Sequence, residues 1–146
     1  MLDWPDRFLL AAALAQLVLT FGLMLWLGLI RVPLVTSGKV GIREIALSND
    51  AWPQSARQVS NAVDNQFQLP VLFYFAVLLL LWSRLTDWPE VLLAWIFVVL
   101  RFMHAYIHTT TNRVDQRFLV YAAGFFVLMA LWGVVAARLL LHPGPV

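Results

Sequence analysis

Cysteine is absent from the 146 residues of this chain. Its absence excludes disulfide bridges, zinc and iron–sulfur sites with thiolate ligands, and a cysteine nucleophile. Charged residues make up only 12% of the chain, about half of the share in an ordinary soluble domain. The formal net charge of +2 is small and the charges are scattered, whereas a nucleic-acid-binding protein presents a basic face or stripe. We therefore expect no nucleic-acid partner.

Hydrophobic residues make up 62% of the chain, which is more than a soluble core of this size can hide. A bilayer core about 30 Å thick is crossed by about 20 helical residues. Four stretches reach this length or nearly so: residues 8–30, 69–82, 88–107 and 118–137. The period-two alternation of membrane strands is missing. The sequence predicts an all-α integral membrane protein in the lipid bilayer, a single domain over residues 1–146 with four transmembrane helices at about 5–32, 54–84, 87–110 and 115–141.

The first apolar stretch has a second interpretation, a cleavable signal peptide. Asp3, Asp6 and Arg7 precede it, so the start of the chain is hardly a positively charged leader. The apolar run also exceeds the usual 7–15 residues of a signal peptide. We expect a first helix that is retained.

The distribution of basic residues predicts the orientation in the membrane. In a four-span protein the first and third connections lie on one side. They carry six basic residues against three on the other side: Arg31, Lys39, Arg43, Arg57, Arg113 and Arg117 against Arg7, Arg84 and Arg138. This predicts that both connections are cytoplasmic. The tail from His142 ends the last helix, and both termini are then on the opposite side of the membrane. The expected location is a bacterial inner membrane.

Polar residues at membrane depth suggest function, because hydrocarbon solvates them poorly. The second predicted helix opens with a polar stripe within an arc of roughly 100°, formed by Arg57, Asn61, Asp64, Asn65 and Gln68. A helix whose first turns stand in water would also be polar there. Such an extension would be polar all round, however, and this one includes Val59 and Phe67.

The third helix carries Arg101, His104 and His108 at spacings of three and four, on one face. The guanidinium of Arg101 is always charged and needs a partner; the alternative is that it snorkels to the cytoplasmic side. An i, i+4 histidine pair can hold a metal ion, but an HExxH motif and a third ligand are missing. We predict no metal site.

A third cluster, Arg113, Arg117 and Tyr121, runs from the third connection into the fourth helix at spacings of four. Taken alone, it also fits a positively charged cytoplasmic anchor with an interfacial tyrosine. All three clusters lie at the cytoplasmic ends of their helices. A bundle could therefore join them into one cationic pocket, suited to a small polyanion with carboxylate and amide groups.

The same residues resemble those of a known family. The series Arg101-x-x-His104, His108, Arg113, Arg117 and Tyr121 is similar to the signature of the third and fourth helices in MAPEG proteins, the membrane-associated proteins of eicosanoid and glutathione metabolism. Asn65-Gln-Phe-Gln68-Leu-Pro70-Val-Leu-Phe73 resembles the second-helix pattern of that family, Asn-x-x-Glu followed by Pro-x-Phe. The resemblance covers nearly the whole chain, its length and its number of spans included.

The resemblance implies a homotrimer of four-helix subunits, with glutathione bound between neighbouring subunits near the cytoplasmic side. Arg117 matches the arginine that holds the glutathione thiolate. Positions that contact the tripeptide or support the site are matched by Asn65, His104, Arg113 and Tyr121. We add Gln68, Arg101 and His108 to the predicted glutathione-binding residues.

Two departures from the family pattern leave two functions open. Gln68 stands where the family has an acid, and His108 stands where it usually has a tyrosine. A second register, with Asn61 and Asp64 in place of Asn65 and Gln68, keeps the acid but moves the proline further away. The first function is a glutathione-dependent transferase or peroxidase acting on lipophilic electrophiles. The alternative is a non-enzymatic MAPEG-like protein that binds a lipid or anionic metabolite, or serves as a scaffold.

Overall fold

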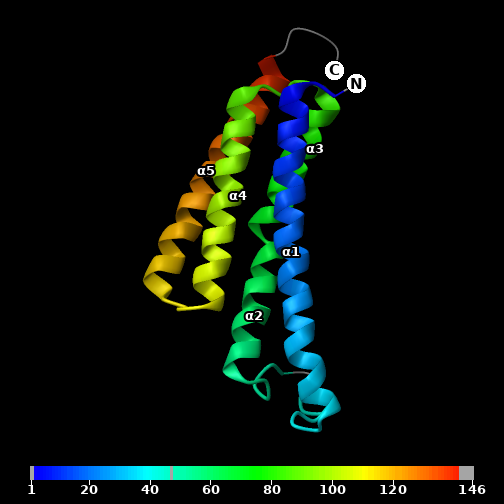
Figure 1. Cartoon of the computed structure of the whole chain (residues 1–146). Coiled ribbons are helices and arrows are strands. Elements are labelled where there is room, and N and C mark those ends of the chain that lie inside the picture. Colours follow the sequence, from blue (N-terminus) through cyan, green and yellow to red (C-terminus); the bar gives the residue numbers. More distant parts are fainter. Residues whose placement is uncertain (1, 47, 142–146) are drawn as a thin grey trace.

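The computed structural model describes residues 2–46 and 48–141 of the chain as a bundle of long helices (Figure 1). In chain order the elements are α1 (Trp4–Thr36), α2 (Gln54–Asp64), the 3₁₀ helix η1 (Asn65–Phe67), α3 (Leu69–Ser83), α4 (Trp88–Thr109) and α5 (Val114–Leu141). Four helical segments of this described part are long and apolar enough to cross a membrane, with α2, η1 and α3 forming one segment from Gln54 to Ser83. The expected four-helix membrane fold is confirmed. The predicted tail at residues 142–146 lies outside the described residues.

The turn between α3 and α4 is tight because its residues favour helix ends. Arg84 ends α3 in the left-handed region, with φ of 55°. Asp87 caps α4, and its backbone N–H is bonded in return by the Glu90 carboxylate, 3.1 Å away. This reciprocal capping box satisfies backbone groups that a helix start leaves without partners, and Pro89 fits the first turn because it needs no N–H partner there.

The core lies where α3, α4 and α5 meet α1. The rings of Phe73 on α3 and Phe97 on α4 stack with centroids 4.8 Å apart, and both side chains are fully buried. Leu9 of α1 and Leu131 of α5 belong to the same buried cluster. The outer surfaces of the spans instead expose large apolar side chains. This arrangement suits lipid, in which helices associate by close packing rather than by the hydrophobic effect.

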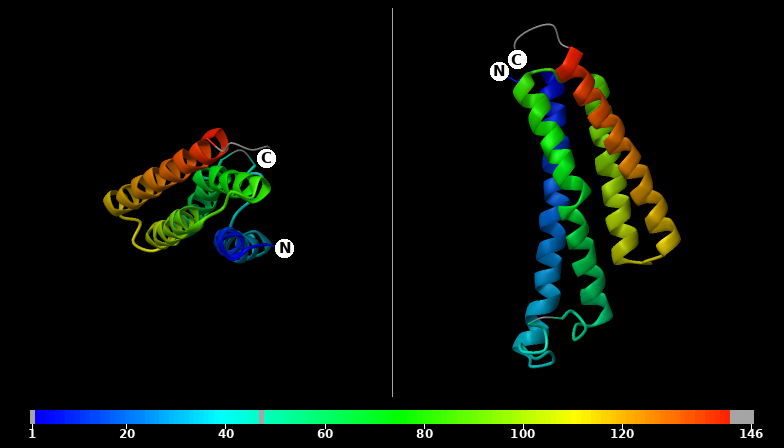
Figure 2. Two further views of the ribbon diagram at one scale, coloured as in Figure 1. Left: turned by 90° about the horizontal axis from the view of Figure 1, so that it is seen from above. Right: turned by 180° about the vertical axis from the view of Figure 1, so that it is seen from behind.

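The two ends of the bundle differ in shape (Figures 1 and 2). The start of α1 and the end of α5 lie at one end, together with the α3–α4 turn. At the other end α1 and α2 extend beyond the α4–α5 turn. The guanidinium of Arg31 secures this extension: it lies 4.6 Å from the ring centre of buried Trp52 and donates to the Ser60 hydroxyl at 2.9 Å.

Candidate functional site

A small cavity of about 210 Å³ lies where the junction of α2 and α3 meets α4 and α5. Four of the eight predicted site residues line it, one from the junction, one from α4 and two from α5: Asn65, His104, Arg117 and Tyr121. The exposed apolar side chains of Val114 and Phe118 complete the lining. The cavity therefore combines cationic, amide, imidazole and phenol groups with an apolar rim.

The α4–α5 turn and the start of α5 position Arg117. Asn112 adopts a left-handed conformation, with φ of 50°, and its side-chain oxygen accepts a hydrogen bond from Nη1 of Arg117. Tyr121 follows one helical turn later on the same face of α5. Its ring centre lies 5.7 Å from that of His104, which packs edge-on against His108 at 5.6 Å. Side chains from α4 and α5 thus form one continuous polar and aromatic group.

Arg101 lies inside the bundle, with only 1% of its surface exposed. It is not snorkelling toward an interface: its Nη2 donates to the backbone carbonyl of Asn65 at 3.0 Å. Its Nε and Nη1 have no hydrogen-bond partner, and no carboxylate of the described residues forms an ion pair with it. The Nδ1 atoms of His104 and His108 are likewise buried without partners. A buried charge is normally paired and hydrogen-bonded, so this group has unused capacity for an anion or a polar ligand.

The second-helix stripe does not lie on one continuous helix, which corrects the sequence prediction. The 3₁₀ turn η1 interrupts the helix at Asn65–Phe67, and Gln68 has the non-helical angles φ −106° and ψ −105°. Pro70 accounts for the interruption, because it has no N–H to donate and its ring clashes with the preceding turn. Beyond the interruption the spacing no longer follows a single helix, and Gln66, absent from the predicted stripe, is the buried residue.

The interruption separates the residues of the two proposed registers. Asn65 is half-buried and lines the cavity, whereas Asn61 and Asp64 are exposed on the outside of the bundle. Gln68 is exposed as well and does not line the cavity. A single chain therefore brings Asn65 to the cavity and leaves the side chain at the position of the family acid facing outward.

Arg113 also lies outside the cavity. Its side chain is 61% exposed and pairs with Asp115 at 3.2 Å. Within one chain the predicted pocket thus contains Asn65, His104, Arg117 and Tyr121, with His108 and Arg101 adjoining them. Gln68 and Arg113 do not join it.

One pair of hydrogen-bonded polar side chains beside the site is missing from the site residues predicted from the sequence. The Nε2 of Gln16 on α1 donates to Oε1 of Gln66 at 2.9 Å, and both side chains are almost fully buried. Gln16 and Thr20 are the polar residues of an otherwise apolar stretch, which is the signal that could have drawn attention to them. The identity of the partner, 50 residues away, is not visible in the sequence.

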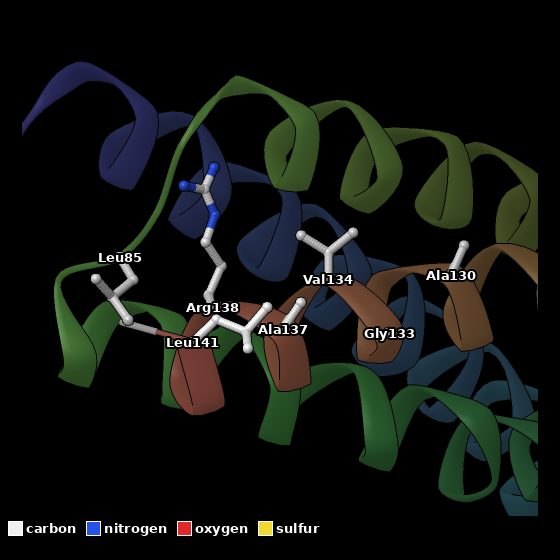
Figure 3. Close-up of a pocket in the computed structure, with 7 residues that line it drawn as sticks. All are labelled: Leu85, Ala130, Gly133, Val134, Ala137, Arg138 and Leu141. Carbon is white, nitrogen blue, oxygen red and sulfur yellow. The ribbon is translucent and has the colours of Figure 1, made fainter. Parts of the chain in front are cut away.

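A larger hollow of about 610 Å³ lies at the opposite end of the bundle, along α5 (Figure 3). Its lining is apolar apart from Arg138. That guanidinium already pairs with the carboxylates of Glu90 at 2.9 Å and Asp87 at 3.3 Å. The hollow therefore has room for a ligand, but its one charged lining residue is already paired. The smaller cavity is the better candidate for binding a polar ligand.

The MAPEG family model matches residues 9–137. No curated protein and no solved structure gives a significant match. Because the family model covers nearly the whole chain, the chain belongs to the MAPEG family. Members of this family commonly use glutathione and are often trimeric, and they include glutathione transferases as well as proteins with other functions.

Proposed function

We propose that this MAPEG protein is a membrane-bound, glutathione-dependent transferase or peroxidase that acts on lipophilic electrophiles. The observation that carries the proposal is the buried guanidinium of Arg101, which pairs with no carboxylate in residues 2–46 and 48–141 and lies beside a cavity that Arg117 lines. Two cations next to a cavity favour an anionic ligand there.

The donor set fits glutathione, which brings two carboxylates and two amide groups. Nitrogen atoms of Arg101, His104 and His108 are buried and unpaired, and Asn65 offers an amide at the cavity wall. The cavity of about 210 Å³ is smaller than the roughly 300–1,000 Å³ of typical ligand pockets. We therefore expect a neighbouring subunit to supply the remaining walls.

Arg117 is proposed to hold the sulfur of glutathione as the thiolate. A free thiol titrates at about 8.5, and a nearby guanidinium favours the reactive anionic form. The thiolate attacks the electrophilic carbon of the substrate, so that a sulfur–carbon bond forms and the leaving group departs. Phe118 is 72% exposed next to Arg117, which provides an apolar approach for a substrate dissolved in the bilayer.

We propose a homotrimer with the site between subunits. Arg57, Asn61, Asp64 and Gln68 are all exposed on the segment from Gln54 to Ser83, and lipid solvates such side chains poorly where the segment lies at membrane depth. A subunit interface would cover this face and could bring Gln68 toward the cavity of a neighbour. The mass of the protein in mild detergent tests the assembly, and a monomer that retains activity would contradict it.

We propose further that the α4–α5 turn and the long α1–α2 connection are cytoplasmic, because they carry the larger share of basic residues. The chain has no native cysteine, so a single Ser48→Cys substitution gives a unique label site. In a bacterial inner membrane it should react only with reagents that reach the cytoplasm. Labelling from the periplasmic side contradicts this orientation.

The alternative function is a non-enzymatic membrane protein that binds a lipid or an anionic metabolite, or acts as a scaffold. Two observations favour it: Gln68 lacks the charge of the family acid, and His108 lacks the phenol of the usual tyrosine. The same unpaired cations would then serve a ligand without a reactive sulfur.

Titration calorimetry of the purified protein with glutathione, followed by a conjugation assay with an aryl halide, distinguishes the two functions. The enzyme hypothesis predicts binding below millimolar glutathione and measurable conjugation. Arg117→Ala should then slow conjugation about a hundredfold, in the range for removal of one group that stabilises developing charge. Arg43→Ala, in the exposed α1–α2 connection, is the matched control and should leave the rate unchanged. If millimolar glutathione does not bind, the alternative function is favoured.

A further inference from the structure

The interruption between α2 and α3 is held by side chains rather than by backbone hydrogen bonds alone. Three side-chain donors reach backbone carbonyls there: Nδ2 of Asn65 donates to Asn61 at 2.8 Å, Nε2 of Gln66 donates to Ala62 at 3.1 Å, and Nη2 of Arg101 donates to Asn65 at 3.0 Å. The Asn61 carbonyl also accepts from the backbone N–H of Asn65, so the side-chain bond there is additional. Helix ends otherwise leave carbonyls without intrahelical partners, and hydrocarbon does not supply the missing donors. Side-chain hydrogen bonds therefore supplement the backbone hydrogen bonds at η1.

Gln66 is the central member of this group, because both ends of its side-chain amide are engaged. Its nitrogen donates to Ala62, and its oxygen accepts from Nε2 of Gln16 at 2.9 Å. The exposed fractions are 2% for Gln66 and 0% for Gln16. With its donor and its acceptor both occupied, the amide of Gln66 is held in one orientation by α1.

Gln16 acts from within the membrane. It follows the start of α1 at Trp4 by 12 residues, which is about 18 Å at a rise of 1.5 Å per residue. It does not line the cavity, but Asn65, the neighbour of its partner Gln66, does. One side-chain hydrogen bond, from Gln16 to Gln66, and one peptide bond, from Gln66 to Asn65, thus connect α1 to the cavity.

We infer that Gln16 is a positioning residue, which through Gln66 fixes the 3₁₀ turn that presents Asn65 to the cavity. The identity of the ligand in this inference rests on the proposed function; the effect on the turn does not. The competing explanation is that the two glutamines only join α1 to the segment that contains η1, as polar residues do between membrane helices. The two explanations differ in what happens to the turn and to ligand affinity when the pair is removed as a whole.

The first test uses the ligand-free protein. Gln16→Leu removes the bond to Gln66, and Gln16→Asn shortens the reach while remaining polar, in case the leucine variant does not fold. Thr20→Val is the matched control. Thr20 is also buried on α1, and its hydroxyl donates to the backbone carbonyl of Gln16, within the same helix. We expect amide hydrogen exchange over residues 62–69 to become about tenfold faster in the Gln16 variants, as the loss of one hydrogen bond allows. Exchange equal to that of Thr20→Val would overturn the inference.

The second test measures use of glutathione. The KM for glutathione should rise about tenfold in Gln16→Leu while kcat is nearly unchanged, because Asn65 contributes uniform binding rather than selective stabilisation of the transition state. The double variant Gln16→Leu/Gln66→Leu removes both amides from the membrane interior. It should regain thermal stability but not affinity, because the Gln66 donor to Ala62 is now lost as well.

Recovery of both stability and affinity in the double variant would show that the pair only joins two helices, and would overturn the inference. If the wild-type protein does not bind glutathione, the proposed function fails on its own. The exchange measurement on ligand-free protein then still decides whether Gln16 positions the turn.

Discussion

Arg101 and Arg138 lie on the neighbouring helices α4 and α5, in opposite halves of the bundle, and differ in whether a carboxylate neutralises their charge. Arg138 pairs with Glu90 at 2.9 Å and with Asp87 at 3.3 Å, and its side chain is 39% exposed. Arg101 is 1% exposed and forms no ion pair with the described residues. Its one hydrogen bond goes to a backbone carbonyl.

The difference separates a structural charge from a functional one. At the end with Arg138 the carboxylates also cap α4, so the charges help to define the fold. At the end with Arg101 no carboxylate of the described residues offsets the cost of burying a cation. A protein retains such a charge where a ligand or a partner subunit supplies the anion, which is why the two ends should respond differently to the same substitution.

The largest expected effect is on ligand binding by Arg101→Met, which keeps an apolar stem in place of the cation. Truncating one side of a buried, hydrogen-bonded charge pair costs about 2–5 kcal/mol. Glutathione affinity should therefore fall about a hundredfold or more. The unfolding temperature of the ligand-free protein should change little, because the lost hydrogen bond to the Asn65 carbonyl is offset by removal of a buried charge that no carboxylate of the described residues neutralises. Calorimetry and thermal unfolding in the same detergent measure both.

The matched substitution Arg138→Met should have the opposite profile. It leaves Glu90, which is fully buried, without its cation. Removing one partner of a buried pair costs about 3–5 kcal/mol, which partial exposure of Arg138 should reduce to about 2–3 kcal/mol. Chemical unfolding in detergent measures this loss, and glutathione affinity should stay at the wild-type value. Equal stability losses in the two variants, with binding retained in both, would remove the distinction between the two ends.

A smaller effect, in the direction of gain, is expected from Gln68→Glu, which restores the family acid. If Gln68 meets the amine of glutathione at a subunit interface, a charge-assisted hydrogen bond replaces a neutral one. Affinity should then rise about tenfold. Asp64→Glu alters an acid one turn away on the same exposed side and serves as the control. A neutral result for Gln68→Glu, with wild-type binding intact, would place this residue outside the site.

The sequence predicts the fold better than the site, for physical reasons. Long apolar runs identify the four spans because the bilayer sets their length. Spacings of three and four on α4 and α5 correctly put His104, Arg117 and Tyr121 on faces that can meet. These features depend only on residues close in the chain.

What the sequence misses depends on partners far along the chain. The 3₁₀ turn breaks the spacing on which the five-residue stripe relied, and Gln66 is buried because of Gln16, 50 residues earlier. The carboxylates that neutralise Arg138 precede it by 48 and 51 residues. A helical face specifies which residues point together, but not whether a neighbouring helix, lipid or another subunit covers them. Gln68 and Arg113 lie outside the cavity within one chain, and their place in a site between subunits stays a prediction.

The central claim is that the cations of the site stabilise an anionic sulfur, and the ultraviolet absorbance of the glutathione thiolate tests it most directly. The titration is recorded across pH for glutathione bound to the wild-type protein, to Arg117→Ala and to Arg117→Lys. We predict that the thiol of bound glutathione titrates below the free value of about 8.5 in the wild type. The pKa of the bound thiol should return toward that value in Arg117→Ala, with Arg117→Lys between them because a point charge replaces a planar fork. Three identical titration curves, with glutathione bound in each case, would contradict the account.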